Sequence, residues 1–188
     1  RDLLETSSDS GVSDAKARLL DGVTIHMAAG DYYLAGEAGA VVEVGFASYA
    51  SPVSITFKGG YPATLTGTNT TVARDTSVTA FTGNTEAKIL HITDNANITF
   101  DGITFKNSNT TDSEHAALGI NSSSASVTVQ HCTFKDNKNS NSGQSGASIT
   151  LVDGTLTISD CSFTGNTARN AGALFLKDGK SLPVRVYL

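Results

Sequence analysis

Charged and aromatic residues are scarce in this chain, and tryptophan is absent. Only 16% of its 188 residues are charged and 7% are aromatic, with 13 lysines and arginines against 18 acidic residues. The net charge of −5 comes without a basic cluster that could contact phosphates, which argues against a nucleic-acid partner. No run of about 18 apolar residues occurs, so the sequence predicts no transmembrane segment.

What the chain does contain is a segment that occurs three times at a fixed spacing of 29 residues. The copies are Ile98–Phe105, Val127–Phe134 and Leu156–Phe163. A repeat of this length is typical of a solenoid, in which each copy forms one coil. Apolar and polar residues alternate within each copy, which predicts strands with one buried side. The inward columns are then Ile98/Val127/Leu156, Phe100/Val129/Ile158, Ile103/Cys132/Cys161 and Phe105/Phe134/Phe163.

A third strand per coil is expected at 116–120, 146–151 and 171–176, each after a polar loop. Three short strands per coil predict an all-β fold, a right-handed parallel β-helix with coils of about 29 residues. Less regular coils are expected earlier, between residues 23 and 92. We assign 1–22 to an N-terminal cap, with a short capping helix over Ser13–Leu20, and 23–188 to the β-helix.

The last residues resemble the start of another coil. Leu182–Leu188 alternates in polarity near the position where the next copy would fall. We therefore expect the solenoid to be truncated here and to continue, or to meet another subunit end to end through an open C-terminal coil. A short natural ending is the alternative.

Cys132 and Cys161 belong to the same inward column, in neighbouring coils. Their Cα atoms should lie about 4.8 Å apart, which is within the range that a disulfide accepts. Side chains in a parallel stack point the same way, however, which makes the disulfide geometry awkward. Two packed free thiols are therefore our prediction, and a disulfide is the alternative.

Two of the turns resemble a known bacterial repeat. Cys132–Asn137 and Cys161–Asn166 resemble the FxxN element of bacterial polymorphic outer-membrane protein repeats. Gly172–Phe175 resembles the GGA-type element that follows it, with Ala171 in place of the first glycine. The resemblance implies a parallel β-helix of the adhesin or passenger type. Independently of it, an asparagine at the turn is expected to hydrogen-bond the backbone of its own and neighbouring coils.

These observations favour a non-catalytic bacterial domain that binds glycans or the surface proteins of a host or neighbouring cell. The alternative is a polysaccharide-active enzyme, such as a pectate-lyase-like lyase or a glycoside hydrolase, or a fragment of one, because relatives of the same fold include such enzymes. We expect an extracellular or cell-surface location, and no cofactor is predicted.

The stacking also brings one group of titratable residues together. Asp101, His131 and Asp160 fall at the same turn of successive coils. They are the catalytic candidates, because carboxylates and a histidine at one place can carry acid–base chemistry on a glycosidic bond. A solvated ion pair at the turn is the alternative, and it is the one we favour.

Two other polar groups were considered as sites or loop contacts. Asp112, Glu114 and His115 lie close together in one loop, but no metal-ligand spacing recurs, so no metal site is predicted. Arg74 and Asp75 are expected to form a salt bridge within a loop.

Outward hydroxyl side chains form two predicted columns, Thr99/Thr128/Thr157 and Thr104/Thr133/Ser162. β-Solenoid ice-binding proteins use regular threonine arrays of this kind. Threonine is also a favoured outward residue of any strand. An array that spans only three coils therefore does not by itself favour ice binding.

Overall fold

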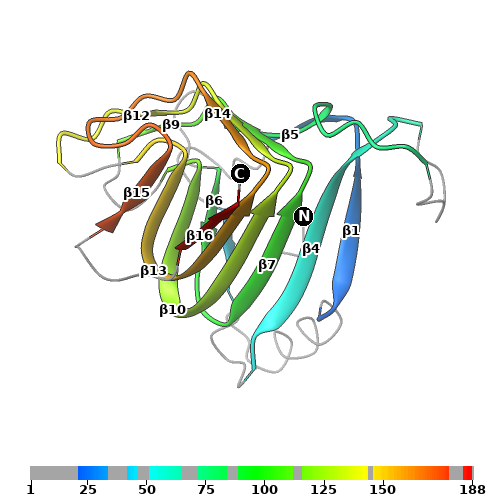
Figure 1. The fold of residues 1–188 in the computed structure, drawn as a ribbon, viewed down its shortest axis with the longest axis horizontal. Coiled ribbons are helices and arrows are strands. Elements are labelled where there is room, and N and C mark those ends of the chain that lie inside the picture. Colours follow the sequence, from blue (N-terminus) through cyan, green and yellow to red (C-terminus); the bar gives the residue numbers. More distant parts are fainter. Residues whose placement is uncertain are drawn as a thin grey trace.

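The strands of the protein stack side by side along one axis, and all the strand pairings described are parallel (Figure 1). The computed structural model describes residues 21–33, 42–45, 51–64, 72–83, 89–111, 116–143, 146–177 and 184–187. The predicted capping helix over Ser13–Leu20 lies outside the described residues and stays a prediction. The all-β solenoid predicted from the repeats is confirmed.

Three sheets form the sides of the solenoid, in nine, five and two strands. The nine-stranded sheet contains β1 (Val23–Ala28), β3 (Val42–Val44), β4 (Val53–Tyr61), β6 (Leu90–Ile92), β7 (Ala96–Asp101), β10 (Leu118–Gln130), β13 (Ile149–Ser159), β15 (Leu174–Leu176) and β16 (Val184–Tyr187). The five-stranded sheet contains β2 (Gly30–Tyr33), β5 (Thr79–Thr82), β8 (Thr104–Lys106), β11 (Thr133–Lys135) and β14 (Ser162–Thr164). The smallest pairs β9 (Asn109–Thr110) with β12 (Lys138–Asn139).

The long strands β10 and β13 turn a corner, which divides the nine-stranded sheet into two arms (Figure 1). β10 pairs with β6 through 118–120 and with β7 through 126–130. Gly154 lies at this corner of β13 with a φ of 112°, and a Cβ there would come within 2.7 Å of the carbonyl oxygen of Ser122. Only glycine fits such a corner. We call the side with β1, β4, β7, β16 and the C-terminal halves of β10 and β13 the second arm.

The register confirms the predicted columns. Val127 pairs with Ile98 on one side and with Leu156 on the other, and the 29-residue spacing is therefore the true coil length at this arm. The other arm is less regular, because Leu118 pairs with Ile149, 31 residues on. Ile149 in turn pairs with Leu174, only 25 residues on. Connections of unequal length absorb the difference, so the stacked strands stay aligned.

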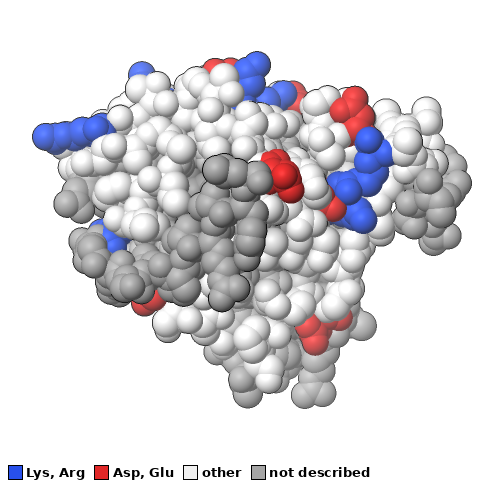
Figure 2. Space-filling view, in the orientation of Figure 1, with Lys and Arg blue, Asp and Glu red and all other residues white. Residues whose placement is uncertain are grey.

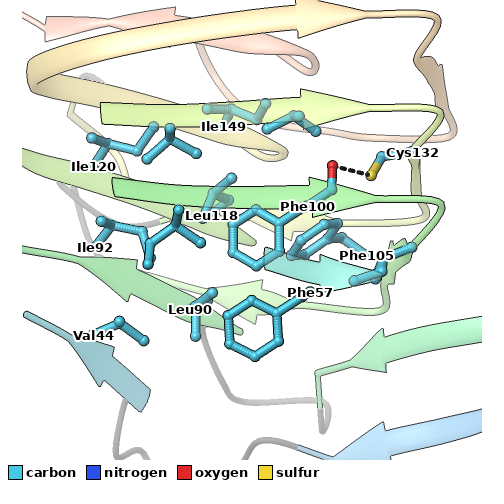
Figure 3. Packing of buried hydrophobic residues seen from close by; sticks show 14 of the residues in the cluster. Val44, Phe57, Leu90, Ile92, Phe100, Phe105, Leu118, Ile120, Cys132 and Ile149 are labelled. Atoms are coloured by element: carbon cyan, nitrogen blue, oxygen red, sulfur yellow. Dashed lines mark hydrogen bonds between the residues drawn. The ribbon is translucent and has the colours of Figure 1, made fainter. Parts of the chain in front are cut away.

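Aromatic and aliphatic side chains from all sides meet in one continuous core (Figure 3). Phe134 lies between Phe105 and Phe163 in a parallel stack, with ring centroids 4.8 Å and 5.0 Å apart. Stacked rings of this kind are each worth about 0.5–1.5 kcal/mol beyond the burial of their area. Phe105 and Phe134 are fully buried, whereas Phe163 is only partly buried. The core therefore thins toward the last coil.

The asparagines of the FxxN turns bind backbone groups across coils, as predicted. The side-chain amide of Asn137 donates to the carbonyl oxygen of Phe105 at 3.0 Å, and its oxygen accepts from the N–H of Ser108 at 3.1 Å. Asn166 repeats the first contact one coil later, donating to the carbonyl oxygen of Phe134 at 2.9 Å. These bonds satisfy backbone groups that the tight turn leaves outside the ladders.

Candidate functional site

The candidate site lies at the turn that joins the second arm to the five-stranded sheet. Gly102, His131 and Asp160 lie at this turn of three successive coils, with φ values of 70°, 52° and 49°. All three are in the left-handed region, which glycine adopts freely and which histidine and aspartate tolerate better than most residues. The same backbone conformation therefore recurs in each coil, and it points the polar side chains of His131 and Asp160 out of the core.

Asp101 is the centre of the cluster. One of its carboxylate oxygens lies 2.9 Å from Nη1 of Arg74, and the other lies 3.0 Å from Nδ1 of His131. On the far side of the imidazole, Nε2 of His131 lies 3.8 Å from an oxygen of Asp160. The structure thus brings the three predicted residues together. We call Arg74, Asp101, His131 and Asp160 the turn cluster.

Arg74 is the member of the turn cluster that the sequence did not indicate. Its Nε donates to the carbonyl oxygen of Gly59 at 2.7 Å, and its Nη2 donates to that of Asp101 at 2.8 Å. Its guanidinium also lies 5.7 Å from the ring centroid of Tyr61. A Cβ on Gly102 would come within 2.6 Å of Nη2, so the absence of a side chain there makes room for Arg74.

The predicted salt bridge between Arg74 and Asp75 is wrong. Asp75 instead accepts hydrogen bonds from the N–H and the hydroxyl of Ser77, at 2.9 Å and 2.6 Å, and these bonds lower the pKa of its carboxyl. Arg74 faces the other way because Asp101 is the more buried acceptor. Residues 74 and 101 are distant in the sequence and belong to an irregular early coil and to the first exact repeat, so no spacing rule relates them.

The environment of Asp101 keeps it ionised. Partial burial by itself raises the pKa of this carboxyl, but the hydrogen bonds from Arg74 and His131, with the positive charge of Arg74, outweigh it. The pKa of Asp101 therefore lies below its ordinary value. With 7% of its side chain exposed and a partner on each oxygen, this carboxylate has little left to offer a substrate.

The chemistry available at the turn cluster is correspondingly limited. The exposed members are His131 and Asp160, whose side chains are 51% and 63% exposed. Acid–base work on a glycosidic bond takes two carboxyl groups that flank the bond, one of them able to carry a proton. Here both carboxylates instead lie on one imidazole. Among the described residues, no group of three or more His, Cys, Asp or Glu side chains is arranged to hold a metal ion.

The remaining sequence candidates fall outside the cluster. Asp112, Glu114 and His115 lie outside the described residues, so the structure does not bear on them. Cys132 and Cys161 are free thiols, as predicted. In the described part of the chain, no helix is long and apolar enough to cross a membrane.

The outward threonine column is longer than the sequence indicated. Thr99 pairs with Thr56, which pairs with Thr24, so the column Thr24/Thr56/Thr99/Thr128/Thr157 spans five coils. Its first two members belong to the irregular coils, where the 29-residue spacing fails and alignment by eye is lost. Ser, Thr and Asn form a second column beside it: Ser54/Asn97/Ser126/Thr155. We call these two columns on the outside of the second arm the polar face.

Parallel coils, inward apolar columns and a turn that recurs in each coil define a parallel β-helix repeat protein. The chain matches the family model described as "Right handed beta helix region" over residues 13–185, and it belongs to that family. This match also supports the predicted right-handed winding. A search of curated proteins and a search of solved structures found no match. The polymorphic outer-membrane protein type remains a resemblance of the turn sequences.

Proposed function

We propose that this chain is a non-catalytic β-helix module that acts outside the cell, at a bacterial surface or after secretion, and binds an extended glycan along its polar face. The observation that carries the proposal is the contrast between two parts of one arm. The titratable side chains are tied to each other in the turn cluster, whereas the polar face beside it presents a regular array of hydroxyl and amide groups.

The polar face suits a carbohydrate chemically. Neighbouring strands are about 4.8 Å apart and alternate residues along a strand about 6.8 Å apart, so the face offers donors and acceptors at a spacing close to that of sugar hydroxyls. Charged side chains are sparse on the side of the molecule shown in Figure 2. Such a face favours a neutral or weakly charged polymer, and its length along the axis favours an extended one.

The enzyme alternative receives less support from the turn cluster. Asp101 is both buried and bonded at each oxygen, and its depressed pKa makes it a poor proton donor near neutral pH. The cluster instead ties an early loop to the first exact repeat through Arg74 and Asp101.

The test is a panel of acidic and neutral polysaccharides, scored both for retained protein and for release of reducing ends or unsaturated sugars. We expect retention without product release, and Thr128→Glu, in the middle of the polar face, should abolish retention. The matched control is Thr164→Glu, which places the same charge on the five-stranded sheet and should bind normally. Product release that disappears in Asp101→Asn would overturn the proposal in favour of the enzyme.

A second candidate function, binding to ice, is favoured by one observation. The threonine column spans five coils rather than three, and a flat periodic row of hydroxyls can match a periodic solid. Thermal hysteresis of the purified protein tests this directly. Hysteresis that Thr128→Glu removes would support ice binding, and a freezing point depressed only as far as the solute concentration requires would rule it out.

A further inference from the structure

The two cysteines form a stacked pair beside the turn cluster. Cys132 lies directly above Ile103 in the inward column, because the N–H of Thr133 bonds to the carbonyl oxygen of Ile103 at 3.1 Å. The N–H of Ser162 likewise bonds to the carbonyl oxygen of Cys132 at 2.9 Å, which places Cys161 on the next level. Neighbouring levels are about 4.8 Å apart at Cα, within the 4.4–6.8 Å range of disulfides.

The two thiols differ in their access to solvent. Cys132 is 1% exposed, and its Sγ lies 3.2 Å and 3.6 Å from the carbonyl oxygens of Gln130 and Phe100 (Figure 3). Cys161 is partly exposed, and its Sγ lies 3.1 Å from the carbonyl oxygen of Ser159. A small molecule in solution therefore reaches Cys161 and not Cys132.

The electrostatics of the pair reinforce this difference. A hydrogen bond from Cys132 lowers the pKa of the Cys161 thiol to about 7, and the nearby His131 acts in the same direction against partial burial. Burial raises the pKa of Cys132 well above its ordinary value. The sulfur that carries the negative charge is thus the accessible one, and thiolate rather than thiol is the reactive form.

We propose that Cys161 is a site of oxidation by hydrogen peroxide or a small organic peroxide, and that Cys132 resolves the oxidised sulfur into a disulfide between successive coils. The partly exposed sulfur reacts, and the buried sulfur one level below it closes the bond. This pairing of an accessible with a resolving thiol goes beyond the binding function and does not depend on it.

The chemistry balances in two steps. The Cys161 thiolate attacks one oxygen of the peroxide, the S–O bond forms, the O–O bond breaks, and the departing hydroxide takes up a proton to leave as water. The Cys132 sulfur then attacks the Cys161 sulfur, the S–S bond forms, the S–O bond breaks, and the hydroxide leaves with the thiol proton as a second water. Two thiols and one peroxide therefore give one disulfide and two waters.

The experiment treats the reduced full chain with a few equivalents of hydrogen peroxide and follows its intact mass. We expect a loss of about 2 Da, reversed by dithiothreitol, and a peptide cross-linked between Cys132 and Cys161 in the non-reduced digest. Because the new bond closes a long loop, Tm should rise by about 5–10 °C in the oxidised form.

Three variants define the roles of the two sulfurs. In Cys132→Ala, peroxide with dimedone should label Cys161, because the sulfenic acid has no resolving thiol. In Cys161→Ala, Cys132 should stay unmodified. The matched control combines Ile103→Cys with Cys161→Ala, which moves the same stacked pair one level down to positions that are both buried. This pair should react far more slowly, with far-UV circular dichroism to confirm that each variant folds.

Several results would overturn the proposal, and the first two need no variant. They are a wild-type protein whose thiols survive peroxide that oxidises free glutathione, and cross-links that form only between chains. Labelling of Cys132 in the folded Cys161→Ala variant would also overturn it, because Cys132 would then be the reactive sulfur.

Discussion

The side-chain oxygen of Asn166 accepts two hydrogen bonds from Asn137, one from its backbone N–H and one from its side-chain amide, each at 3.0 Å. The two asparagines occupy the same turn of successive coils. Each also binds a phenylalanine carbonyl in the coil below. A chain of amide bonds therefore runs parallel to the axis, beside the stacked phenylalanine rings.

Replacement of Asn137 is expected to destabilise the protein strongly. Asn137→Ala leaves the N–H of Ser108 and the carbonyl oxygen of Phe105 without their partner in a buried turn, at about 1–3 kcal/mol for each unsatisfied group. Urea unfolding measures the loss. Asn141→Ala, at a more exposed loop position, is the control and should cost less than 1 kcal/mol. Equal losses in the two variants would contradict a structural role for the amide chain.

The phenylalanine stack should respond according to depth. Phe134→Ala removes a fully buried ring with a neighbour on each side and is expected to cost about 3–5 kcal/mol. Phe163→Ala removes a partly buried ring with one stacked neighbour and should cost clearly less. The two variants differ only in coil, so denaturant midpoints compare them directly. A larger loss at Phe163 would mean that the core is better covered at the last coil than the structure indicates.

The left-handed turn at Asp160 predicts an unusual order of substitutions. At a φ of 49°, Asp160→Gly should be about 1 kcal/mol more stable than Asp160→Ala, and Asp160→Val should be the least stable. The same pair of substitutions at Thr157, in the extended strand β13, should give the reverse order for Gly and Ala. Thermal unfolding of the variants tests both orders.

Acid should remove the stabilisation that comes from Asp101. Its pKa is lower in the folded chain than the ordinary 3.8, so the unfolded chain binds the proton more readily. The stabilisation is complete above the unfolded pKa and is lost as the pH falls through the folded pKa. The Tm difference between wild type and Asp101→Asn should therefore be constant near neutral pH and shrink below about pH 4.

The control for this pH dependence is Arg74→Gln. Without the guanidinium, one of the groups that lower the pKa of Asp101 is gone, and the acid-dependent part of the stability should decrease with it. A difference between wild type and Asp101→Asn that stays the same down to pH 3 would show that the ion pair contributes no pH-dependent stability.

Regular parts of the chain could be predicted from the sequence, because a fixed spacing converts residue numbers into neighbours. The columns of Phe105 and Val127 and the meeting of His131 with Asp101 all follow from the 29-residue period. Arg74 could not be placed in this way, because it comes from a coil that lacks the period. Thr24 and Thr56 were missed for the same reason.

The loop contact of Arg74 shows where local reasoning fails. Two adjacent residues of opposite charge invite a local ion pair, yet Asp75 finds closer donors in Ser77, and Arg74 finds a buried carboxylate in Asp101. A buried, bonded carboxylate attracts a guanidinium more strongly than an exposed one does. That preference depends on burial, which no sequence spacing reports.

The unequal connections on the side of β9 and β12 bear on how such a chain can diverge. Seven residues separate Thr110 from Leu118 and nine separate Asn139 from Ile149, yet the strands that follow pair in register. Insertions and deletions are thus tolerated between these elements, while any change of length between Ile98 and Phe105 would shift a whole column by one place. Lineages that carry this fold should accordingly vary in length along one rim and keep the opposite turn almost constant.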